Sequence, residues 1–135
     1  MNQRLLFILA FPGVVLGVLI MLGILQNLFL LALIWLFIAG LYPFIIVADM
    51  AHMRLFHTFL AVFICGSFIF AIPVEWYPVF YKNNPERIDV LNYTYRHPRR
   101  MMFAIGEVLV LFSGLISVII TDVLIGLRRA SLWYP

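Results

Sequence analysis

Charged residues are scarce in this chain of 135 amino acids. They make up 11% of the sequence, whereas hydrophobic residues make up 65%. A water-soluble domain has about one quarter charged residues, and a small domain buries only part of its apolar surface. With a mean hydropathy of +1.09, this composition excludes a soluble fold for most of the chain. It indicates that lipid is the main solvent.

The sequence also lacks paired cysteines and the common catalytic motifs. Cys65 is the one cysteine, so no internal disulfide can form. The redox compartment stays undecided, and we interpret Cys65 as a small buried residue. There is no glycine-rich phosphate loop, no H-E-x-x-H and no G-x-S-x-G sequence. Because no catalytic set is visible, we lean towards a protein that is not an enzyme.

Four apolar stretches are each long enough to cross a hydrocarbon core of ~30 Å at ~1.5 Å per residue. Only a short break at Gly23, Gln26 and Asn27 separates the first two, which predicts a tight helical hairpin. The first stretch is too long for a signal peptide and lacks an A-x-A-like cleavage site, so we expect it to be an uncleaved span. The sequence thus predicts an all-α integral membrane bundle of four transmembrane helices, in one domain over residues 1–135. The expected spans cover about 5–25, 28–48, 55–72 and 101–127.

The polar segment 73–100 connects the third and fourth predicted spans. Its four prolines disfavour a continuous helix, and the polar tips of its Tyr and Trp residues suit the headgroup boundary. We therefore expect an aromatic, proline-rich interfacial loop along the membrane surface, with room for one short helix. The expected interfacial anchors are Trp76, Tyr77 and Tyr81, with Trp133 and Tyr134 at the opposite face.

Basic residues give the chain a net charge of +3. They lie at the ends of the predicted spans and in the 73–100 loop, as is usual in membrane proteins, so we expect no nucleic-acid partner. Four spans place both termini on one side. The basic residues are nearly balanced between the two sides, and the shorter basic segments on the terminal side favour cytoplasmic termini. We expect a bacterial inner (cytoplasmic) membrane protein.

The fourth predicted span carries a carboxylate near each end, Glu107 and Asp122. Both lie about 10–12 Å from the centre of the span, where a carboxylate still reaches water or a long basic side chain. On a helical wheel, Gly114, Ser117 and Thr121 fall within about 80° of Glu107, and Asp122 falls about 60° to its other side. This pattern favours a stripe that faces protein, with each acid paired to a basic residue at its own boundary. A proton or ion path lined by the two acids is the alternative.

Asp49, His52 and His57 lie between the second and third predicted spans. Their spacing on a continuous helix allows a pair between Asp49 and His52, whereas His57 would lie about 140° from His52. Two histidines do not complete a metal site. We therefore interpret them as interfacial histidines and keep metal or haem binding as the alternative, with the cofactor unknown.

Two further patterns indicate contacts: one with a headgroup or a partner outside the predicted spans, and one between helices. A basic group before the fourth span suits an anionic headgroup or a partner protein. Gly13 and Gly17 fit the small-xxx-small spacing that allows two helices to approach closely. The basic group consists of Arg96, His97, Arg99 and Arg100.

Three functions are compatible with these patterns. The first is a non-enzymatic accessory or structural subunit of a larger membrane complex, with the lipid bilayer and other membrane subunits, or further copies of the chain, as partners. The second is a small oligomeric transporter or channel that uses Glu107 and Asp122. The third is a membrane redox or lipid-modifying enzyme subunit that binds haem, quinone or lipid. We favour the first, because the sequence shows no catalytic set.

Overall fold

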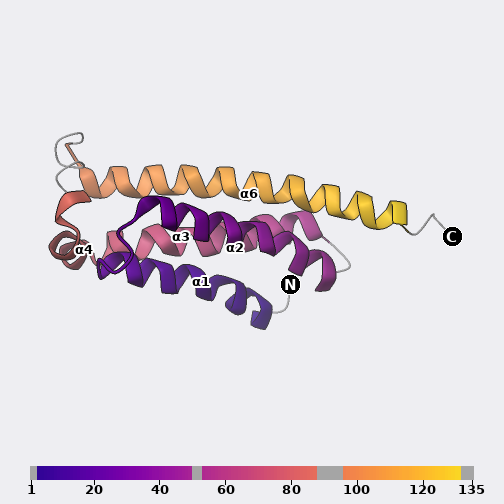
Figure 1. Ribbon diagram of the computed structural model, residues 1–135, viewed down its shortest axis with the longest axis horizontal. Helices are drawn as coiled ribbons and strands as arrows, with labels where there is room; N and C mark the ends of the chain where they lie inside the picture. Colours follow the sequence, from indigo (N-terminus) through magenta and orange to yellow (C-terminus); the bar gives the residue numbers. More distant parts are fainter. Residues whose placement is uncertain (1–2, 50–52, 88–95, 132–135) are drawn as a thin grey trace.

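The structure is a computed structural model that describes residues 3–49, 53–87 and 96–131. Four helices in these ranges are long and apolar enough to span a membrane, which confirms the predicted all-α bundle (Figure 1). A fifth helix, α4, is short. The helices are α1 (Gln3–Met21), α2 (Leu28–Asp49), α3 (Arg54–Glu75), α4 (Tyr77–Asn83) and α6 (Pro98–Ser131).

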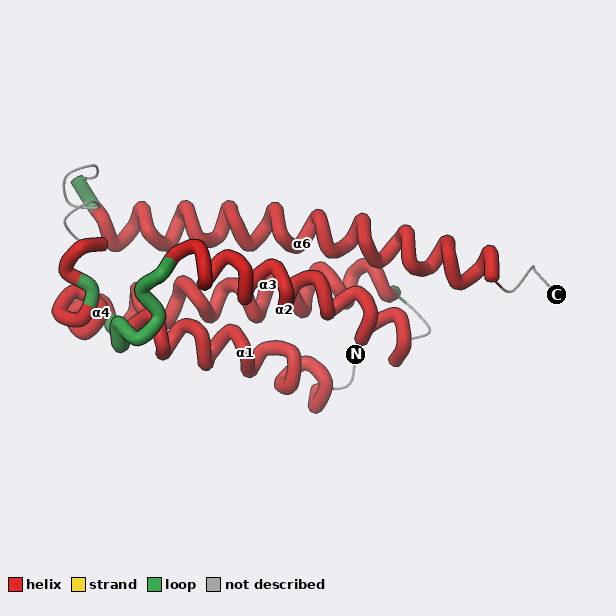
Figure 2. Tube along the Cα trace, in the orientation of Figure 1, coloured by secondary structure: helices red, strands yellow, loops and turns green. Residues whose placement is uncertain are grey.

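The four long helices run along one common axis (Figures 1 and 2). Helix α3 makes the most extensive contacts, with α1 and with α6, and α2 packs against α6 and α3. The turn between α1 and α2 lies together with α4 at one end of the bundle (Figure 1), which we call the loop end. Helix α6 is the longest and extends beyond its neighbours at the other end (Figure 1). Its 34 residues span about 51 Å, more than a ~30 Å core requires.

Helix α1 ends at Met21, four residues before the predicted end of the first span. The cause is Gly23, which adopts a left-handed conformation with φ 72° and donates a hydrogen bond from its N–H to the carbonyl of Ile20. Glycine is the residue best suited to this helix-ending conformation. Asn27 then caps α2, because its Oδ1 accepts a hydrogen bond from the N–H of Leu30 at 3.0 Å.

The prolines of the predicted interfacial loop interrupt the helices less than we expected. Helix α3 continues through Pro73 and ends at Glu75, so the third span is longer than predicted. Trp76 breaks the helix, and α4 follows with a proline in its first turn. Helix α6 begins at Pro98 rather than at residue 101, because a proline is well tolerated in a first turn. It also continues beyond the predicted end at residue 127.

Close contact between α1 and α3 explains the two glycines of the first span. A Cβ atom at Gly13 would lie 1.9 Å from the carbonyl oxygen of Cys65, and one at Gly17 would lie 2.6 Å from that of Phe68. These positions therefore pack directly on the backbone of α3, as the small-xxx-small pattern predicts. Cys65 itself is fully buried, and its Sγ lies 3.2 Å from the hydroxyl of Tyr42. It is a small core residue, as expected.

Candidate functional site

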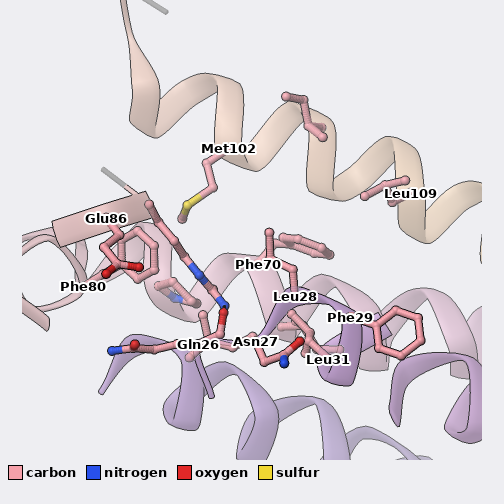
Figure 3. A pocket seen from close by; sticks show the side chains of 15 residues that line it. Gln26, Asn27, Leu28, Phe29, Leu31, Phe70, Phe80, Glu86, Met102 and Leu109 are labelled. Carbon is pink, nitrogen blue, oxygen red and sulfur yellow. The ribbon is translucent and has the colours of Figure 1, made fainter. Parts of the chain in front are cut away.

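A groove of about 740 Å³ opens between α2, α3 and α6 near the loop end (Figure 3). Its volume falls within the range of about 300–1,000 Å³ that is typical of sites for small molecules. Met102 points from α6 into this space, above Phe70 and Phe80, and Gln26 and Asn27 lie at its far side (Figure 3). Its lining residues are Ile20, Gln26, Asn27, Leu28, Phe29, Leu31, Ile69, Phe70, Pro73, Phe80, Glu86, Arg87, Met102, Ile105 and Leu109.

The walls of the groove are apolar because three helices turn hydrophobic faces towards it. On α6 the lining residues Met102, Ile105 and Leu109 are spaced by three and four, so they share one helix face. Met102 and Leu109 are separated by about 10 Å along the helix axis. One leaflet of a ~30 Å hydrocarbon core is about 15 Å thick. The apolar wall on α6 is therefore about two thirds as long as one leaflet is thick.

The chain that follows α4 completes the polar end of the groove. Helix termini leave backbone carbonyls without partners inside the helix, and here side chains after Phe80 satisfy those at the end of α1. Asn84 donates from Nδ2 to the carbonyls of Ile20 and Phe80, at 3.0 and 3.1 Å. Asn83 lies 3.4 Å from the carbonyl of Met21. These contacts attach the 83–87 segment to the α1–α2 turn.

Arg87 is the central charged group at this polar end. Its Nη2 donates to the carbonyl of Leu25 at 3.0 Å and to the carbonyl of Gln26. Its Nε is buried without a hydrogen-bond partner, and burial lowers the pKa of the guanidinium from its ordinary value. Both partners of Arg87 are neutral, so these contacts give the arginine no counter-charge.

The small and hydroxyl residues of the fourth span lie at helix contacts. A Cβ atom at Gly114 would be 3.0 Å from the ring of Phe59. Ser117 Oγ lies 3.0 Å from the carbonyl of Ala39, and the hydroxyls of Thr121 and Thr58 lie 3.0 Å apart. Both hydroxyls of α6 are also within hydrogen-bond distance of their own helix backbone. This geometry favours helix packing over an ion path for these three positions.

The two acids of the fourth span have different surroundings. Glu107 is half-buried and accepts a hydrogen bond from Ser67 of α3 at 3.1 Å. Asp122 is exposed, although we expected it to face protein. An offset of about 60° from the stripe is enough to turn it outwards at the edge of the helix contact. The structure does not bring the two acids together.

The predicted interfacial residues lie at the loop end. Trp76 and Tyr81 are exposed and Tyr77 is half-buried. Arg99 forms an ion pair with Glu75 at 3.7 Å. Arg96, His97 and Arg100 are exposed.

The remaining predicted residues are the histidines with Asp49, and the aromatic anchors near the end of the chain. His52, Trp133 and Tyr134 lie outside the described residues, and so does the side chain of Asp49. His57 is half-buried beside the ring of Phe56. Within the described residues, no group of three or more His, Cys, Asp or Glu side chains is arranged to hold a metal ion.

Neither the groove nor the role of Arg87 is visible in the sequence. Nothing in the local sequence distinguishes Arg87 from the other basic residues of the 73–100 loop, because its partners are about sixty residues away in the chain. Comparison of the chain with protein-family models, with curated proteins and with solved structures finds no match.

Proposed function

We propose that this chain is a non-catalytic membrane protein that binds one amphiphilic lipid molecule in the groove between α2, α3 and α6. The observation that carries the proposal is the composition of the groove. Its walls are apolar over about 10 Å along α6, which suits a hydrocarbon tail. Its polar end holds Arg87, whose partners among the described residues are neutral carbonyls. Ligand sites commonly combine a mostly apolar lining with a few placed polar groups.

The accessory-subunit function predicted from the sequence is compatible with this proposal. A bound lipid would then be part of the surface that the chain offers to a larger complex. The transporter alternative has less geometric support, because Ser117 and Thr121 have protein partners and Asp122 is turned outwards. Co-purification of larger subunits in a gentle detergent would support the accessory role.

The groove is tested by filling it from α6. We expect Ile105→Trp, which places a large ring among the lining residues, to displace the bound lipid. Ile116→Trp is the matched control, because Ile116 is exposed on the same helix and is not among the lining residues. Native mass spectrometry of the protein released from lipid nanodiscs should show one retained lipid for the original chain and for Ile116→Trp, and none for Ile105→Trp.

Two results would contradict the proposal. One is an original chain that retains no lipid under conditions that preserve its fold by circular dichroism. The other is equal lipid retention by Ile105→Trp and Ile116→Trp, which would place the lipid elsewhere on the protein.

A further inference from the structure

Two neighbouring residues at the polar end of the groove carry opposite charges. Glu86 and Arg87 both line it, and within the described residues they form no ion pair with each other. Arg99 and Glu75, by contrast, do form an ion pair. Arg87 uses Nη2 on the Leu25 and Gln26 carbonyls, while Glu86 is exposed. The groove thus offers one cationic and one anionic group to its ligand.

We propose that the groove selects a phospholipid whose headgroup carries both a phosphate and a primary ammonium. The phosphate lies against Arg87, the ammonium lies against Glu86, and an acyl chain follows the apolar wall towards Leu109. This inference rests on the proposed lipid binding, and it names the class of lipid.

The chemistry of each group supports this assignment. Arginine is the residue best suited to phosphate, because its planar guanidinium presents several N–H donors to phosphate oxygens. Arg87 lines the groove, and its hydrogen-bond partners among the described residues are neutral backbone carbonyls, so a phosphate would supply the missing negative charge. The carboxylate of Glu86 can accept hydrogen bonds from a primary ammonium, which has three N–H donors, whereas a quaternary ammonium has none. A headgroup with only negative charge would satisfy Arg87 and be repelled by Glu86.

The position of these groups in the bundle fits a headgroup. Arg87 is attached to the turn that joins α1 to α2, so it lies where two spanning helices leave the membrane. The exposed Trp76 and Tyr81 lie at the same end, and such residues settle at the headgroup boundary. The lipid therefore comes from the leaflet on the loop side.

The two contacts differ in strength. A hydrogen bond between charged groups contributes about 1.5–3 kcal/mol, so loss of the phosphate contact corresponds to roughly ten- to hundredfold weaker binding. Glu86 is exposed, and exposed ion pairs contribute at most about 1 kcal/mol. We therefore expect Glu86 to change selectivity by no more than about fivefold.

The test is lipid competition in nanodiscs that contain equal amounts of phosphatidylethanolamine, phosphatidylcholine and phosphatidylglycerol, read out by native mass spectrometry. The original chain should retain phosphatidylethanolamine about three- to fivefold over phosphatidylglycerol. Glu86→Gln should remove or reverse this preference. Arg87→Gln should weaken retention of all three lipids about ten- to hundredfold. Lys82→Gln is the matched control, because Lys82 is an exposed cation at the end of α4, and it should behave like the original chain.

The outcomes separate this inference from the function on which it rests. If Ile105→Trp displaces the lipid but the original chain and Glu86→Gln show the same headgroup preference, the assigned headgroup is wrong and the lipid groove stands. Equal losses for Lys82→Gln and Arg87→Gln would overturn the role of Arg87. If the original chain retains no lipid, both proposals fail. Should Arg87→Gln not fold, the comparison of Glu86→Gln with the original chain still decides the headgroup.

Discussion

Replacement of Gly13 by alanine tests the close packing of α1 on α3. The added Cβ atom would lie 1.9 Å from the carbonyl oxygen of Cys65, whereas real Cβ atoms essentially never come within 3.0 Å of another heavy atom. The obstructing atoms belong to the α3 backbone, so no side chain can rotate away. The two helices must therefore separate by at least the difference of these distances, 1.1 Å.

This displacement sets the expected loss of stability. A radial gap of about 0.5–1 Å already forfeits a quarter to a half of the attraction between packed atoms, and overpacked positions typically lower the free energy of unfolding by about 1–3 kcal/mol. Because backbone has to move along the α1–α3 contact, we expect a loss near the upper end, about 3 kcal/mol. Gly40→Ala and Gly126→Ala are the controls, since a Cβ atom at either position meets nothing within 4 Å.

Two measurements would reveal the displacement. Thermal unfolding in detergent, followed by circular dichroism, should occur at a clearly lower temperature for Gly13→Ala than for either control. Cys65 supplies a second readout, because it is fully buried beneath this contact and is the one cysteine of the chain. A membrane-permeant maleimide should label it faster in Gly13→Ala than in Gly40→Ala. Equal melting temperatures and equal labelling rates for the two variants would refute the close packing.

Two further predictions concern Glu107 and the topology. Glu107→Gln keeps an acceptor for the hydroxyl of Ser67, so it should lower the free energy of unfolding by less than about 1 kcal/mol. It should also leave proton flux in reconstituted vesicles unchanged. Loss of flux in a variant that folds normally would instead favour the ion path. The topology can be tested with single cysteines in a Cys65→Ser background and an impermeant thiol reagent. Asn2→Cys and Ser131→Cys should react from one face of the membrane, and Lys82→Cys should react from the other face. Reaction of Asn2→Cys and Ser131→Cys from different faces would exclude four spans.

Composition and apolar run length were enough to predict the membrane bundle. Each long helix satisfies its own backbone hydrogen bonds, and a span must match the thickness of the bilayer, so both properties are visible in a single sequence. Helix ends were less predictable. Pro73 lies within α3 and Pro98 starts α6, although both residues look alike as local breakers. At Pro98 the missing N–H falls in the first turn, where a helix offers it no partner. At Pro73 it costs α3 one hydrogen bond, and the helix ends two residues later.

Only the tertiary structure could reveal the groove and its polar end. The wheel of the fourth span correctly places Ser117 and Thr121 in a buried contact, because a helix repeats its own geometry. A helical wheel does not show how much of the helix surface the contact with α3 covers. For this reason Asp122 was expected to face protein, whereas its side chain is exposed. Arg87 becomes distinctive only when the 83–87 segment folds back over the end of α1, where free carbonyls are available. A hydrogen bond between residues so far apart in the chain leaves no pattern in the sequence around either residue. The groove between three helices likewise leaves no pattern in the sequence of any one of them.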